Sequence, residues 1–162
     1  MKRTPILGAT LALALTFAGT AAAASFSERG TARMSMTINT PCQTSQGCFG
    51  LKGGIHGTPL SGAVEASFTA DWSQGGTCAP AGGTLILSNA HGDSLNLMST
   101  GTLCRHGARS ATYSGAWNIE NGSGKFASNG VGGGKLTMRQ LGNGLVQLAV
   151  RGSFSMSSRP AQ

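Results

Sequence analysis

Hydrophobic side chains alternate with small polar ones along most of the chain beyond residue 33. The alternation is clearest in the runs at 34–38, 85–87, 95–97, 136–138 and 146–150. Gly, Asn, Asp, Ser and Pro separate these runs at short intervals, and no stripe with a helical period follows the N-terminal segment. A period of two predicts strands that bury one face. We therefore predict an all-β, antiparallel domain.

Pairing residues across one predicted turn tests this prediction. If residues 84–99 form a hairpin that turns at 90–92, Leu85 lies opposite Leu97 and Leu87 lies opposite Leu95. Such apolar pairs on one face of a hairpin stabilise a single register. The sequence therefore predicts a hairpin over these residues.

The same register predicts a disulfide. It places Cys78 opposite Cys104, and a disulfide requires closely spaced Cβ atoms. The remaining pair, Cys42 and Cys48, is predicted to close a small loop. Four cysteines allow three connectivities, and this one has support from the hairpin. The spacings lack the paired C-x2-C pattern of zinc sites.

A second hairpin is predicted over 135–155 around the turn at 142–144. It places Met138 opposite Leu148 and Leu136 opposite Val150. Three-residue loops that contain Gly suit such a connection.

The stretch NGSGKFASNGVGGGKL, residues 121–136, holds two Gly-Lys pairs. We predict a hairpin loop at 121–124, with Ile119 facing Phe126 and Glu120 facing Lys125. The later glycines are typical of a bulge or a barrel corner. A phosphate-binding loop needs G-x4-G-K followed by Ser or Thr and a helix. A hydrophobic residue follows each lysine and no helix is predicted, so this interpretation fails.

The N-terminus predicts export. Two basic residues precede the apolar segment 6–17, and three alanines that end at Ala24 give a small-x-small cleavage site. We predict a signal peptide over 1–24, cleaved after Ala24, and one mature domain over 25–162. The apolar segment is too short to remain as a membrane span. The expected location is the periplasm or the extracellular space, where disulfides form.

Charge narrows the classes of partner. Removing Lys2 and Arg3 leaves ten basic and five acidic residues, a net charge of +5. The basic residues are scattered singly along the chain, whereas nucleic-acid binders show clustered basic stripes, usually with interleaved aromatics. We expect no nucleic-acid partner. A weak attraction to an anionic envelope component stays open.

Two stretches resemble repeating phrases of small exported bacterial β-barrels. They are YSGAWNIENGSGKFASNGVGGGKL from residue 113 and LILSNAHGDSLNLMSTG from residue 85, and the match runs from about Gly57 to Met156. In pattern these proteins are similar to the allene oxide cyclase and dirigent families. The resemblance implies a calycin-like, up-and-down barrel of about eight strands whose lumen takes a small apolar molecule. It carries over no catalytic residue.

Candidate chemistry is sparse. Glu65 alternates with Val64 and Ala66, so we expect it to face solvent; if its face proves to be the lumen, it is the first catalytic candidate. No G-x-S-x-G elbow occurs. The remaining candidate acids and bases have no evident catalytic arrangement: Glu28, Asp71, Asp93, Glu120, His56, His91, His106 and Tyr113.

Two methionines suggest a metal alternative. Met34 and Met36 lie on one face of a predicted strand, and with His56 and Trp72 they have the ligand types of a copper(I) site. Methionines at this spacing are more often flexible core filling. We predict no metal and no cofactor.

The sequence leads to three hypotheses of function. The leading one is a non-catalytic, disulfide-stapled barrel that binds a small apolar ligand or an envelope component. The second is a barrel isomerase or cyclase, and the third is a structural or protein-interaction barrel with a filled interior. An open apolar lumen favours the first two, and a lumen filled by side chains favours the third.

Overall fold

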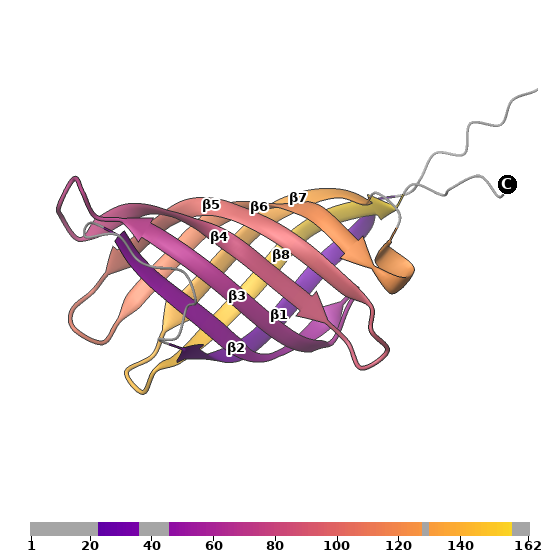
Figure 1. Ribbon diagram of the computed structural model, residues 1–162, viewed down its shortest axis with the longest axis horizontal. Helices are drawn as coiled ribbons and strands as arrows, with labels where there is room; N and C mark the ends of the chain where they lie inside the picture. The colour runs from indigo at the N-terminus through magenta and orange to yellow at the C-terminus, as the bar shows by residue number, and fades with distance from the viewer. Residues whose placement is uncertain (1–22, 36–45, 128–129, 157–162) are drawn as a thin grey trace, which may run out of the picture.

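The chain forms a closed barrel of eight antiparallel strands, each paired with its neighbours in sequence, with β8 returning to β1 (Figure 1). The computed structural model describes residues 23–35, 46–127 and 130–156. The strands follow one another in this order: β1 Ala24–Ser35, β2 Gln46–Thr58, β3 Gly62–Asp71, β4 Cys78–Ser88, β5 Ser94–Arg105, β6 Ala111–Ser123, β7 Gly130–Gln140 and β8 Leu145–Met156. The prediction of an all-β, up-and-down barrel is confirmed. Closure leaves no unpaired sheet edge.

Both hairpins with apolar ladders adopt the predicted register. Leu85 pairs with Leu97 and Leu87 with Leu95 between β4 and β5. Between β7 and β8, Met138 pairs with Leu148 in the same way. Each strand buries one face, so a slip of one residue would turn every apolar side chain outward.

The β4–β5 register also carries the disulfide. Cys78 and Cys104 are directly opposite each other, with Cα atoms 4.0 Å apart, and their sulfurs are bonded. Cys48 on β2 is disulfide-bonded too. Cys42, its predicted partner, lies outside the described residues, as do Met36 and residues 1–22 of the predicted signal peptide.

The hairpin predicted at 121–124 is wrong. Strand β6 continues to Ser123, and Gly124–Phe126 form a 3₁₀ turn before β7. The carboxylate of Asp93, in the β4–β5 turn, accepts the backbone N–H of Lys125 at 2.9 Å, and its other oxygen lies 3.7 Å from Lys125 Nζ. Lys125 therefore pairs with Asp93 and not with Glu120. Contacts from the β4–β5 turn therefore fix the conformation at 124–126, and pairing β6 with β7 alone does not include them.

Side chains fill the middle of the barrel. Trp117 pairs with Gly134, which pairs with Gly152, which pairs with Phe26. The Trp117 indole donates Nε1–H to the Arg151 carbonyl at 3.0 Å and packs on Phe26 with ring centroids 4.7 Å apart. The two glycines let β7 and β8 approach closely, because a Cβ at either would collide with backbone of the other strand. Leucines and aromatics from every strand complete this core. An eight-stranded barrel is just wide enough to be filled in this way.

Candidate functional site

The two ends of the barrel differ. At the end that carries the β2–β3 and β4–β5 turns, Leu60 and Phe126 are buried, at 2% and 4% exposure, and close the interior. Phe126 packs edge-on against Phe154 of β8. The opposite end carries the turns at 72–77, 106–110 and 141–144. The cavity lined by Met34, Phe49 and Val146 lies at this second end.

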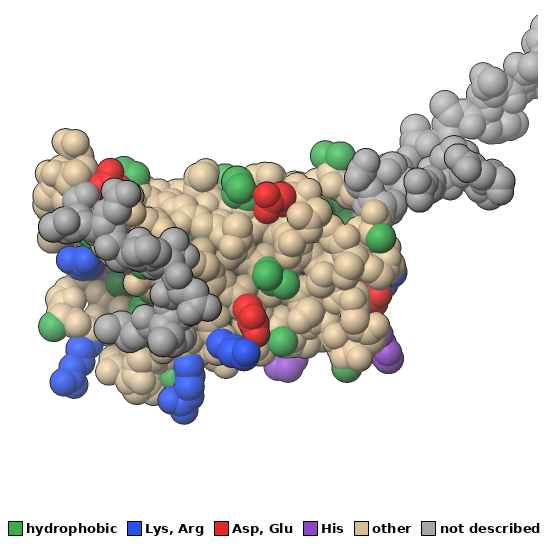
Figure 2. All heavy atoms as spheres, in the orientation of Figure 1, with side chains coloured by type: hydrophobic (Ala, Val, Ile, Leu, Met, Phe, Trp, Pro, Cys, Tyr) green, Lys and Arg blue, Asp and Glu red, His purple; other side chains and the backbone are tan. Residues whose placement is uncertain are grey.

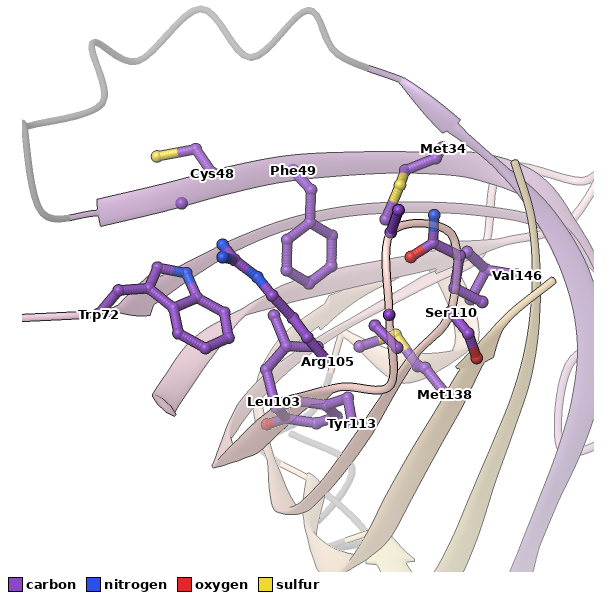
Figure 3. Close-up of a pocket in the computed structure, with 15 residues that line it drawn as sticks. Met34, Cys48, Phe49, Trp72, Leu103, Arg105, Ser110, Tyr113, Met138 and Val146 are labelled. Atoms are coloured by element: carbon purple, nitrogen blue, oxygen red, sulfur yellow. The ribbon is translucent and has the colours of Figure 1, made fainter. Parts of the chain in front are cut away.

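A cavity of about 230 Å³ opens at this second end, which we call the mouth (Figure 3). The lining includes apolar side chains from most of the strands: Met34 of β1, Phe49 of β2, Leu103 of β5, Tyr113 of β6, Met138 of β7 and Val146 of β8. Alternation explains their convergence, because each is an inward position of its strand. Figure 3 shows the Phe49 ring reaching from β2 into the cavity.

Aromatic side chains fix one wall of the mouth. Phe49 stacks on Phe68 with ring centroids 5.5 Å apart, and Phe68 meets Tyr113 edge-on at 5.1 Å. The Tyr113 hydroxyl lies 2.7 Å from Ser99 Oγ, which donates to the Ala116 carbonyl, also at 2.7 Å. Burial raises the pKa of Tyr113, opposed by the Ser99 hydrogen bond. The phenol therefore stays neutral near pH 7 and serves as a rigid wall.

A stacked cation and indole form the rim of the mouth. The guanidinium of Arg105 lies 3.6 Å from the ring centroid of Trp72 (Figure 3). The Arg105 backbone N–H donates to the Thr77 carbonyl at 2.7 Å, directly beside the Cys78–Cys104 bond. The disulfide thus anchors the residue that carries the cation. Such cation–π contacts contribute about 0.5–1 kcal/mol at exposed sites.

The Trp72 indole packs tightly against β2. A Cβ at Gly47 would lie 2.8 Å from Trp72 Nε1, so a larger residue there would displace the ring. Nε1 is buried and has no hydrogen-bond partner among the described residues. Trp72 lies at the start of the β3–β4 turn, directly after Asp71. The Asp71 carboxylate accepts the Ser73 N–H at 2.9 Å, and this hydrogen bond lowers the pKa of Asp71.

The described lining contains no carboxylate and no histidine. Its polar side chains are the guanidinium of Arg105, the Tyr113 hydroxyl, the Ser110 hydroxyl and the Gln140 amide, while Cys48 is disulfide-bonded. These groups donate hydrogen bonds and attract anions, but none is a base at neutral pH. The mouth is therefore suited to binding more than to proton transfer.

Glu65, the first catalytic candidate from the sequence, lies on the outside of the barrel. Its Oε1 is 2.7 Å from Nζ of Lys52 on the neighbouring strand, and 56% of the glutamate side chain is exposed. The glutamate hydrogen bond raises the pKa of Lys52. Glu65 thus faces solvent, as its alternation with buried Val64 and half-buried Ala66 predicts.

Of the residues proposed for copper, the structure describes Met34, His56 and Trp72, and it does not bring His56 to the other two. Met34 lines the mouth, but His56 is exposed on the outer wall near the far end of β2. Trp72 does share the cavity with Met34. Within the described ranges, no group of three or more His, Cys, Asp or Glu has the spacing of a metal site.

Sequence reasoning missed a buried carboxyl. Glu28 has no exposed surface, and its Oε1 accepts the Leu60 N–H at 2.8 Å. Burial raises the pKa of Glu28, while that N–H and the charge of His56 act against the rise. Its signal was the alternation of Phe26, Glu28 and Ala32, which puts all three inward. Glu28 lies at the closed end and is absent from the mouth lining.

In the described part of the chain, no helix has the length and apolarity needed to cross a membrane. No family model matches the chain, and no curated protein or solved structure matches it either.

Proposed function

We propose that the protein is a non-catalytic binding barrel that holds a small apolar ligand in its mouth. The observation that carries this proposal is the 230 Å³ cavity, walled by aromatic and thioether side chains and bordered by a fixed cation. Ligand sites are typically apolar hollows with a few placed polar groups. The family resemblance points to a barrel with a ligand in its lumen, and here the space lies at one end.

Cavity size limits the ligand. An engineered cavity of about 150 Å³ in another protein takes benzene. A hollow of about 230 Å³ therefore suits a molecule of one or two rings, and it is below the range of about 300–1,000 Å³ common for drug-sized ligands. The buried side chains in the middle of the barrel prevent a long ligand from passing through.

The proposed setting is an exported protein in the periplasm or outside the cell, with the signal peptide cleaved after Ala24. The Cys78–Cys104 disulfide is compatible with an oxidising compartment. The outward faces of the strands carry mostly small polar and charged residues, whereas a barrel that spans a membrane turns an apolar band outward. This supports a water-facing wall.

A matched pair of variants on β6 tests the mouth. Ala111 lines the cavity, and Ala116 is exposed on the outer face of the same strand. Titration calorimetry with indole and p-cresol should show binding that Ala111→Phe removes and Ala116→Phe preserves. Native mass spectrometry of protein purified from its own host should also show a retained small mass. If neither probe binds, or if Ala116→Phe removes binding equally, the mouth is not the site.

A structural or protein-interaction barrel is the second candidate. It is supported by the filled middle, where Trp117, Phe26 and their neighbours leave no continuous lumen. Failure of both probes together with no retained mass would favour this candidate. For the isomerase or cyclase alternative, the described mouth lining offers no carboxylate or histidine as a catalytic acid or base.

A further inference from the structure

Five basic residues that are scattered in the sequence lie on one outer face of the barrel. Arg29 and Arg33 lie on β1, Lys135 and Arg139 on β7, and Arg151 on β8, all exposed. These three strands are adjacent in the order β1–β8–β7. We call these five residues the basic face. Figure 2 shows the opposite side of the barrel, where β2, β3 and β4 run in front in Figure 1 and where acidic and basic side chains both occur.

The register of the paired strands places basic side chains directly opposite one another. Lys135 is directly opposite Arg151, and Arg33 is directly opposite Lys52. Like charges in opposite positions of a sheet are destabilising. Of these cations, Lys52 alone has a carboxylate partner in the described part of the chain, through its bond to Glu65.

The carboxylates lie elsewhere. All five acidic residues of the chain are among the described residues. Glu65 and Asp71 are on β3, Asp93 is in the β4–β5 turn, Glu120 is near the end of β6, and Glu28 is buried inside. The basic face therefore carries five positive charges, none of which has a carboxylate partner among the described residues.

An open groove of about 800 Å³ crosses this face from β2 to β6. Arg29 and Arg139 lie along it, and the other outward side chains of the lining are mostly small and polar: Thr31, Thr112, Ser114, Thr137 and Gln147, with Ala149 and His56. Arginine binds carboxylates with two parallel hydrogen bonds. Hydroxyl and amide groups can donate to and accept from sugar hydroxyls.

From this arrangement we propose that the groove binds a linear polysaccharide that carries carboxylate groups, with Arg29 and Arg139 on successive acidic sugars. Single-stranded nucleic acids are held by aromatic stacking, and the described outward positions of β1, β7 and β8 hold no Phe, Tyr or Trp. A lipid surface is held by apolar anchors. Of the exposed large hydrophobic residues, Ile86 and Met98 lie on β4 and β5, away from this face, and a single one, Val131, lies on a strand of the face, β7.

The test uses polygalacturonate as the probe and Arg29→Ser/Arg139→Ser as the variant. The control is Arg109→Ser/Lys125→Ser, which removes the same charge from two loops outside the face. Wild type should bind the polymer in 50 mM NaCl and several-fold more weakly in 300 mM NaCl, because salt screens exposed charges. The face variant should bind about tenfold more weakly, as expected for two lost exposed ion pairs. The control should bind like wild type.

Three results would overturn the proposal. One is an equal loss in the control variant, which would show that net charge alone drives binding. Another is equal or tighter binding to phosphatidylglycerol vesicles or to poly(dT), which would assign the face to a lipid surface or to nucleic acid. The third is no binding to polygalacturonate at low salt. Unchanged circular dichroism and melting temperatures in both variants establish that the substitutions leave the barrel folded.

Discussion

Replacing Glu28 by Gln should change how the stability of the barrel depends on pH. The Glu28 side chain has no exposed surface. One of its oxygens accepts the Leu60 N–H, and Oε2 has no partner among the described residues. An ionised carboxylate in this position loses its hydration without full compensation. Burial accordingly raises the pKa of Glu28 above its ordinary value of 4.5, although the Leu60 N–H and His56 oppose the rise.

The sign of the effect follows from that direction. Below pH 4.5 the carboxyl is protonated in both the folded and the unfolded protein, so the stabilising effect of the raised pKa is fully present. As the pH rises through the raised folded pKa, this stabilisation is lost, because the unfolded chain releases its proton first. Within that window the free energy of unfolding falls by at most about 1.4 kcal/mol per pH unit. Glutamine keeps the acceptor for Leu60 and cannot ionise, so it removes the loss.

Urea unfolding followed by tryptophan fluorescence from pH 4 to 8 measures this difference. Wild type and Glu28→Gln should have similar stability at pH 4, and the variant should become the more stable protein as pH rises. Glu120→Gln, which removes an exposed carboxyl, is the control and should follow wild type. The comparison repeated in a His56→Gln background isolates the effect of the His56 charge on the pKa of Glu28. Parallel curves for wild type and Glu28→Gln would refute the reasoning.

Three further experiments test the fold. Gly134→Ala should lower the free energy of unfolding by about 1–3 kcal/mol, because the added Cβ collides with backbone of β8. Gly142→Ala is the control: open space surrounds this position, so the urea midpoint should change little. Cys78→Ser/Cys104→Ser should lower the free energy of unfolding by about 3 kcal/mol, as expected for a sequence separation of 26, and unchanged stability would contradict this. Glu65→Gln should alter stability by less than about 1 kcal/mol, because its ion pair is exposed, and should leave ligand binding at the mouth intact.

The strands and two of the hairpin registers were predictable because their signals are local. Leu85 and Leu87 alternate on one strand and meet an equal alternation across a short turn. Given the face that must be buried, one register satisfies both strands. The Cys78–Cys104 bond follows from that register alone. Turn residues and alternation are properties of adjacent segments, so a single sequence carries them.

The end of β6 was mispredicted because its structure depends on a third strand. The register between β5 and β6 shifts at Asn96/Leu97, and Ser94 Oγ lies 2.8 Å from Ser123 Oγ. Asp93 then binds the Lys125 backbone and holds the 3₁₀ turn. Pairing β6 with β7 as an isolated hairpin takes no account of these contacts.

The candidate sites were even less predictable, because barrel closure creates them. Arg105 and Trp72 are 33 positions apart in sequence and stack because two turns meet at the same end. Likewise, Arg29 and Arg151 belong to one face because β8 closes on β1. No local pattern in the sequence reports which strands become neighbours at closure.

Strand β7 contributes residues to both proposed binding surfaces, the mouth and the groove on the basic face. Met138 of β7 points into the mouth, and Arg139, the next residue, projects onto the basic face. Tyr113 and Met138 line both the mouth cavity and the outer groove, so the wall between the two is a single layer of sheet. Because successive side chains of a strand point to opposite faces, a substitution at Val146 of β8 changes the cavity and one at Gln147, the next residue, changes the groove. The two binding proposals can therefore fail or succeed separately.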